Sequence, residues 1–174
     1  MNYILEMGTS IRHNQLISRL QFEIMKLFQG KDILTLHEQI ALCYLGTAAE
    51  PYLTRLIDLK SDNITKDMLN SLQVVQPDYM LFETNKYISN PNETRLAGQP
   101  NLIVEIWSDY NIEAHRNFKK FLYSTADTTE HWYIEQNANN VECWLGNKKL
   151  PEQSLKNILS TQSGIKIDLK YLAI

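Results

Sequence analysis

Residues 102–107 read Leu-Ile-Val-Glu-Ile-Trp, an apolar hexapeptide with one acid inside it. A continuous apolar run of this length is typical of a strand that is buried on both faces of a sheet. An ionised carboxylate is costly to bury without compensation, so Glu105 needs a cation, a metal ion or hydrogen-bond donors around it. The hexapeptide therefore predicts a central strand that carries a compensated acid.

A second acid stands at the start of another apolar segment. Asp78 follows Pro77 and precedes Tyr-Met-Leu-Phe, which we expect to form a strand over residues 79–82. Two carboxylates on neighbouring strands offer the oxygen ligands that divalent cations prefer. With Lys119 in the helical segment that follows residue 107, these residues predict a divalent-metal site suited to phosphodiester chemistry.

Each of these three residues also has a simpler interpretation. Asp78 after a proline is common in turns. Glu105 could be paired with an arginine such as Arg95 or Arg116. A helical lysine such as Lys119 is most often a solvated surface residue.

Length and composition indicate one domain that spans residues 1–174. The chain has 174 residues, of which 44% are hydrophobic and 21% charged, as in ordinary globular proteins. It shows neither a signal peptide nor an apolar stretch of membrane-spanning length, so we expect a cytoplasmic protein without membrane association. Cys43 and Cys143 support neither a disulfide framework nor a zinc site.

The formal net charge of -3 weighs mildly against nucleic-acid binding, which needs a basic surface. It does not exclude such binding, since a local basic patch can coexist with a negative total and bound metal partly neutralises acidic ligands. The residues that could form such a patch are Arg116, Lys119, Lys120, Lys148 and Lys149.

The spacing of apolar residues predicts the other elements. We expect a helix over residues 12–28 with Ser10 as its N-cap, and a second helix over 112–123 that residues 108–111 cap. Residues 85–99 have the Asn, Pro and Gly content of a loop. The segments that we expect to contain strands are 33–45, 52–57, 79–82, 101–107, 131–135 and 141–145, and segments 155–159 and 165–169 close the chain. We also expect a short helical turn at 65–72 and the end of the first helix at Gly30. Strands alternating with helices indicate an α/β fold, with a mixed sheet flanked by helices.

Several motifs occur together in a recognisable order. They lie at residues 12–17, 75–78, 98–108, 118–123 and 130–134. In order and spacing they resemble a bacterial family of restriction-endonuclease-like proteins, abundant in cyanobacteria and grouped with the PD-(D/E)xK nuclease superfamily. The resemblance implies a restriction-endonuclease-like core.

The resemblance also implies roles for individual residues. Asp78 and Glu105 would bind Mg²⁺ or Mn²⁺, with the backbone carbonyl of Ile106 as a further ligand. Lys119 would be the catalytic lysine, because Trp107 fills the place two residues after the second acid where the superfamily usually has it. Tyr123 shares the helical face of Lys119.

An acid from the first helix enters the site in related nucleases, and Glu23 is the candidate here. Three positions depart from the family pattern, namely Asn101, Asp109 and His115. None of the three is a proposed metal ligand.

On this resemblance, the expected function is that of a metal-dependent endonuclease that hydrolyses phosphodiester bonds, with DNA as substrate. Cleavage of both strands of a duplex usually calls for two active sites, so a homodimer is expected by analogy. The alternative is a non-catalytic module that binds nucleic acid or a protein on the same fold.

Overall fold

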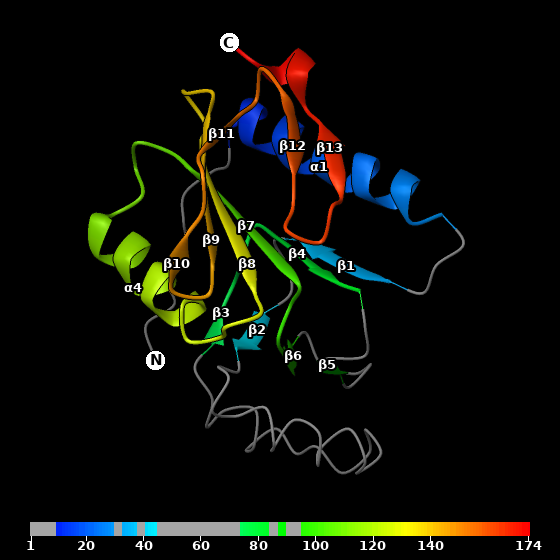
Figure 1. The fold of residues 1–174 in the computed structure, drawn as a ribbon. Coiled ribbons are helices and arrows are strands. Elements are labelled where there is room, and N and C mark those ends of the chain that lie inside the picture. The colour runs from blue at the N-terminus through cyan, green and yellow to red at the C-terminus, as the bar shows by residue number, and fades with distance from the viewer. Residues whose placement is uncertain (1–9, 30–32, 38–40, 45–73, 84–86, 90–94) are drawn as a thin grey trace.

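The computed structural model describes residues 10–29, 33–37, 41–44, 74–83, 87–89 and 95–174 (Figure 1). Within these residues, the α-helices are α1 (Ile11–Leu27) and α4 (Glu113–Tyr123). Ser10 caps α1 as predicted, by accepting the backbone N–H of His13 at 3.1 Å. By contrast, the N-cap of α4 is Ile112, which makes no side-chain capping hydrogen bond. Asn111 instead closes the preceding turn by accepting the backbone N–H of Ser108.

A large mixed sheet forms the centre of the described structure. Its strands run in the order β1-β4-β7-β8-β9-β10, and β11 also pairs with β9. These strands are β1 (Leu34–His37), β4 (Tyr79–Phe82), β7 (Leu102–Trp107), β8 (Glu130–Glu135), β9 (Asn140–Leu145), β10 (Lys148–Lys149) and β11 (Gln153–Ser154). Strands β7 and β8 are parallel, and α4 lies in the connection between them.

Two smaller sheets accompany the large one. A four-stranded sheet has the order β3-β2-β6-β5, built from β3 (Val74–Val75), β2 (Ala41–Tyr44), β6 (Arg95–Gly98) and β5 (Tyr87–Ser89). A hairpin of β12 (Ile158–Ser160) and β13 (Lys166–Asp168) precedes a short 3₁₀ turn, Lys170–Leu172. No helix in the described part of the chain is long and apolar enough to cross a bilayer.

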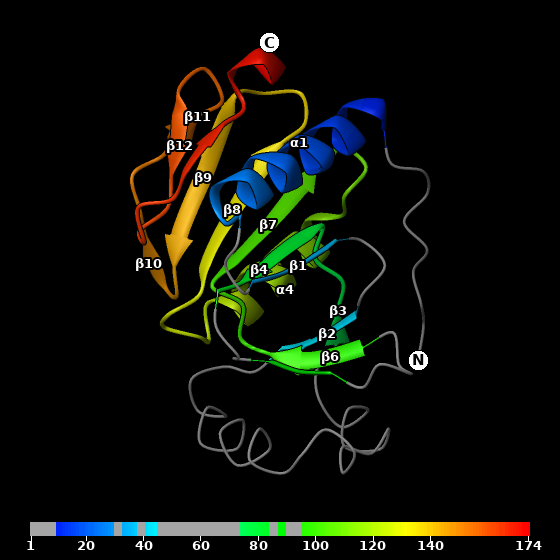
Figure 2. The same ribbon diagram turned by 90° about the vertical axis from the view of Figure 1, so that its right-hand side faces the viewer.

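The two helices lie on opposite faces of the large sheet (Figures 1 and 2). Alternation along β7 explains how one strand serves both faces, because successive side chains point to opposite sides. Leu102, Val104 and Ile106 belong to the core cluster that α1 covers, whereas Ile103 and Trp107 belong to the cluster that includes residues of α4. By this alternation, Glu105 lies on the α4 face.

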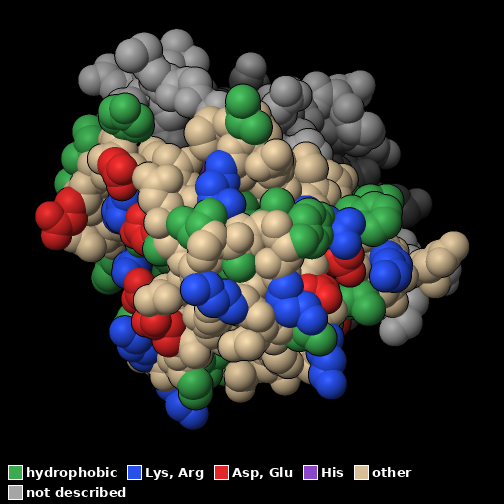
Figure 3. All heavy atoms as spheres, turned by 90° about the horizontal axis from the view of Figure 1, so that it is seen from above, with side chains coloured by type: hydrophobic (Ala, Val, Ile, Leu, Met, Phe, Trp, Pro, Cys, Tyr) green, Lys and Arg blue, Asp and Glu red, His purple; other side chains and the backbone are tan. Residues whose placement is uncertain are grey.

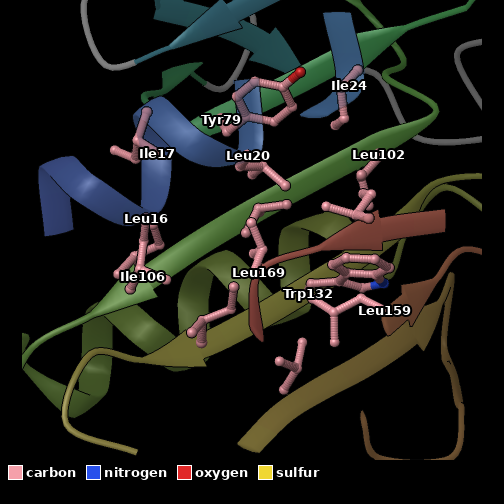
Figure 4. Packing of buried hydrophobic residues seen from close by; sticks show 14 of the residues in the cluster. Leu16, Ile17, Leu20, Ile24, Tyr79, Leu102, Ile106, Trp132, Leu159 and Leu169 are labelled. Atoms are coloured by element: carbon pink, nitrogen blue, oxygen red, sulfur yellow. The ribbon is translucent and has the colours of Figure 1, made fainter. Parts of the chain in front are cut away.

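Helix α1 contributes a buried apolar stripe to the larger of these clusters. Leu16, Leu20 and Ile24 pack toward β7 and β8, near Ile106 and Trp132 (Figure 4). A fully buried aliphatic side chain stabilises a fold by about 1.5–3 kcal/mol relative to the exposed state. The stripe therefore fixes the rotation of α1 on the sheet.

Some sequence predictions need correction. Residues 85–99 are not a continuous loop, because they contain β5 and β6. The strand expected within 33–45 is two strands, β1 and β2, which belong to different sheets. The elements expected at 52–57 and 65–72, and Gly30 as a helix terminator, lie outside the described residues.

A buried histidine in β8 joins the central strands to the turn after β9. His131 is 1% exposed, and its Nε2 donates to the Gly146 carbonyl at 2.8 Å. Since a carbonyl can only accept, Nε2 carries the proton and Nδ1 accepts from the Tyr133 hydroxyl at 2.7 Å. Burial lowers the pKa of His131 to about 4, so the ring is neutral near pH 7.

Stability is therefore expected to fall as the pH drops from about 6.5 to about 4. In this window the unfolded chain protonates His131 and the folded chain does not, so stability present above pH 6.5 is lost on acidification. The loss from this residue is at most about 3 kcal/mol. Glu130, whose pKa is raised mainly by burial, partly opposes it.

Comparison with a non-titrating variant isolates the contribution of His131. His131→Gln keeps an N–H donor for the Gly146 carbonyl, and denaturant unfolding can be measured for both proteins at pH about 7 and about 4.5. The wild type should lose more free energy of unfolding between these pH values than the variant. Equal losses in the two proteins would contradict the prediction.

Candidate functional site

Strand register brings the two predicted acids together. Strands β4 and β7 are antiparallel, with Tyr79 opposite Val104. Continuing this register by one residue places Asp78 opposite Glu105. Asp78 Oδ2 accepts the backbone N–H of Ile106 at 2.6 Å, so the carboxylate of Asp78 is fastened to β7 itself.

Glu105 is buried, and residues of helix α4 contact both of its carboxylate oxygens. It is 1% exposed, its Oε2 lies 2.8 Å from Lys119 Nζ, and its Oε1 accepts the Tyr123 hydroxyl at 2.6 Å. Lys119 and Tyr123 are one helical turn apart, so one face of α4 presents both to β7. Lys119 Nζ also donates to the Gln76 carbonyl at 3.2 Å, which links α4 to the segment before β4.

Tyr123 remains a hydrogen-bond donor in this arrangement. Burial, followed by the negative charge of Glu105, raises the pKa of Tyr123 well above its ordinary value. The phenol of Tyr123 is therefore protonated near neutral pH. It fixes one oxygen of Glu105 while the ammonium of Lys119 fixes the other.

The backbone of Ile106 faces the Asp78 side of β7. The Trp107 carbonyl accepts from the backbone N–H of Gln136, at the end of β8, at 2.8 Å. Because adjacent residues of a strand direct their backbone groups to opposite sides, Ile106 directs its own away from β8 and toward Asp78. This orientation suits the carbonyl of Ile106 as an oxygen ligand beside Asp78.

The donor set fits a hard divalent cation. It consists of two carboxylates and a backbone carbonyl, and Mg²⁺ is usually held by one or two carboxylates together with water and phosphate oxygens. In the described residues, no three His, Cys, Asp or Glu side chains gather as a metal-binding group. Oxygen donors of this kind suit Mg²⁺ or Mn²⁺ better than zinc, whose protein ligands are mostly His and Cys.

Helix α1 approaches the site with His13. Its Nε2 lies 3.5 Å from Asp78 Oδ1. Glu23 instead pairs with Arg19 at 2.6 Å and lies ten residues further along α1, about 15 Å along the helix axis. The sequence signal for His13 was its place in the buried stripe of α1, at helical spacing from Leu16.

The remaining basic residues of α4 are paired with acids. Arg116 Nη1 lies 2.6 Å from Glu135 Oε1, and Lys120 Nζ lies 2.7 Å from Glu142 Oε2. Lys119 is thus the ion-pair partner of Glu105, and Arg116 is the partner of Glu135. Figure 3 shows a face on which basic and acidic side chains are interspersed. Pairing of this kind weakens the basic patch that the sequence suggested.

A polar pocket of about 550 Å³ lies beside the site on the α4 face. Trp107 lines it and is two residues from Glu105 on the same face of β7. The other lining residues are Asp109, Asn111, Glu113, Arg116, Asn117, Lys120, Glu135 and Glu142. Four of them are acidic and two are basic, so the pocket is not a cationic phosphate cradle.

Comparison with known proteins finds a shared fold. No family model and no curated protein matches the chain. A solved structure does match, the crystal structure of a "putative nuclease belonging to DUF820" from Anabaena variabilis ATCC 29413. The TM-score is 0.66 at 11% sequence identity, and the match covers 98% of this chain and 87% of that one.

The chain therefore shares the fold of this Anabaena protein. The predicted fold class, a mixed sheet flanked by helices, is therefore confirmed.

Proposed function

We propose that the protein is a metal-dependent nuclease that uses Mg²⁺ or Mn²⁺ to hydrolyse phosphodiester bonds in DNA. The observation that carries this proposal is the convergence of Asp78, Glu105 and Lys119 from the start of β4, from β7 and from α4. The similarity to the fold of the Anabaena protein supports it.

The positions of these residues indicate a different role for each. Asp78 and Glu105, with the Ile106 carbonyl, would hold the cation. When bound, a divalent cation lowers the pKa of a coordinated water and stabilises charge on phosphoryl oxygens. Tyr123 fixes one oxygen of Glu105 by its 2.6 Å hydrogen bond, which limits the orientations that this carboxylate can take.

Lys119 lies next to the carboxylates, in a position to contact the phosphodiester. Its Nζ contacts Glu105 and the Gln76 carbonyl, so the ammonium stands next to β7 and next to the segment that carries Asp78 into β4. It would stabilise a non-bridging phosphoryl oxygen or orient the attacking water. In the reaction, water oxygen bonds to phosphorus and the bond to the leaving sugar oxygen breaks. A proton released from the water is balanced by protonation of that leaving oxygen.

A second candidate function is a non-catalytic module that binds nucleic acid or protein. Its support is that Lys119 and Tyr123 contact both oxygens of Glu105, which compensates the buried carboxylate without a metal. The pairing of Arg116 and Lys120 with acids points the same way. This candidate predicts no metal affinity at the Asp78–Glu105 pair.

Calorimetric titration of Mn²⁺ separates the two functions. The proteins to compare are the wild type, Glu105→Gln and the control Glu142→Gln, with circular dichroism to check folding. Glu105→Gln removes the charge and keeps an oxygen for the Tyr123 hydroxyl, whereas Glu142 is an acid that pairs with a different lysine of α4. We expect binding in the wild type and in Glu142→Gln, and its loss in Glu105→Gln.

A plasmid-cleavage assay with and without Mn²⁺ then tests the chemistry. Metal binding with metal-dependent nicking or linearisation of DNA supports the nuclease. A folded wild type that binds no Mn²⁺, even with DNA present, would refute it and leave the binding module. Sedimentation measurements of the same sample test the proposed homodimer, which duplex cleavage calls for.

A further inference from the structure

The carboxylate of Asp78 is held from two directions. Its Oδ2 accepts the Ile106 N–H at 2.6 Å, and its Oδ1 lies 3.5 Å from His13 Nε2. His13 is only 6% exposed, although it lies in the first turn of α1. The second distance is that of a longer polar contact, and such contacts are often long in ligand-free sites and tighten on binding.

The first turn of α1 is itself fixed to the end of β8. Ser10 Oγ accepts the His13 backbone N–H at 3.1 Å and donates to Gln136 Oε1 at 2.7 Å. Arg12 Nε donates to the Gln136 carbonyl. The Gln136 N–H in turn donates to the Trp107 carbonyl at 2.8 Å. The backbone that carries His13 is thus tied to the same ends of β7 and β8 that frame the site.

The burial of α1 also restricts where the imidazole can point. His13 continues the buried stripe of Leu16, Leu20 and Ile24, so it faces the sheet. The other buried polar side chain of this helix, Glu23, has its partner within the helix in Arg19 at 2.6 Å. His13 instead reaches across to a residue of another element, at the carboxylate of Asp78.

We propose that His13 is a positioning residue, which orients the carboxylate of Asp78 for metal binding. This inference rests on the proposed function. Partners that hydrogen-bond to a ligating carboxylate set its orientation, and their loss typically lowers metal affinity about 10–100-fold. The Ile106 N–H of β7 fixes one oxygen of Asp78, and His13 of α1 fixes the other. The carboxylate of Asp78 would then be held in one orientation before a metal ion binds.

Two polar substitutions of equal charge test this role. His13→Gln places its side-chain amide near the position of Nε2, whereas the shorter side chain of His13→Asn reaches only to the position of Nδ1. Glu23→Gln is the control for loss of a buried polar interaction on the same helix. Mn²⁺ affinity is measured for all three and the wild type by calorimetric titration, with thermal unfolding followed by circular dichroism.

His13→Asn is expected to weaken Mn²⁺ binding about 10–100-fold. His13→Gln should recover most of that affinity, and Glu23→Gln should bind as the wild type does. If His13 had only a structural role, its substitution would lower the melting temperature, and His13→Gln would not restore the Mn²⁺ affinity that His13→Asn loses. Wild-type affinity in folded His13→Asn would overturn the inference and leave the proposed function standing. Absence of Mn²⁺ binding by the wild type would overturn both.

Discussion

Asp78→Ala is expected to abolish Mn²⁺-dependent DNA cleavage, with a loss of more than about 1,000-fold in rate. The substitution removes one of the two carboxylates that the register of β4 and β7 places opposite each other. It also leaves the Ile106 N–H without the acceptor that now lies 2.6 Å away. Initial rates of plasmid nicking at saturating Mn²⁺ give the measurement.

Asp78→Asn is the matched control for the structural part of this effect. Its amide oxygen can still accept the Ile106 N–H, so it should retain more of the wild-type stability than Asp78→Ala. The difference should be about 1–3 kcal/mol, the cost of an unsatisfied buried donor. Both variants should lack cleavage. Wild-type cleavage by either folded variant would rule out Asp78 as a metal ligand.

Lys119→Met is expected to lower turnover about 100- to 1,000-fold while Mn²⁺ affinity is retained. Methionine keeps much of the aliphatic stem but removes the ammonium that lies 2.8 Å from Glu105. The metal ligands remain, so the defect should fall on kcat rather than on metal binding. Single-turnover cleavage and calorimetric titration of Mn²⁺ report the two quantities separately.

Lys120→Met provides the comparison for this prediction. Lys120 is the adjacent lysine of α4, but it pairs with Glu142 rather than with Glu105. Its replacement should leave both turnover and Mn²⁺ affinity near the wild-type values. If Lys119→Met lost metal binding, Lys119 would be needed to assemble the site rather than to act on the substrate.

The central strands were predictable because their signal is local. Residues 79–82 and 102–107 are apolar runs bounded by proline or turn residues, and both form the expected strands. The spacing of Lys119 and Tyr123 likewise predicted one helical face, which the structure confirms at Glu105. A charge inside an apolar strand was informative because burying it requires such partners.

The misread elements depend on partners far away in the sequence. Strand β6 pairs in parallel with β2, more than fifty residues earlier, so its own residues contain little sign of the pairing. Its glycine and the nearby Asn and Pro residues resemble a loop. His13 was missed as a site residue for the same reason. Only the packing of α1 against the sheet shows that its imidazole meets Asp78.

The parallel pairing of β7 with β8 through α4 has a consequence for the order of folding. Residues 102–145 contain β7, α4, β8 and β9 in one continuous stretch. Within it, β7 pairs with β8, and β8 pairs with β9. The paired residues of these strands are closer in sequence than those of β2 and β6, so bringing them together costs less chain entropy. Glu105, Lys119 and Tyr123 all lie inside this stretch, whereas Asp78 and His13 join from outside it. Glu105, Lys119 and Tyr123 would thus come together within this local unit, and the centre would become complete only when β4 and α1 dock.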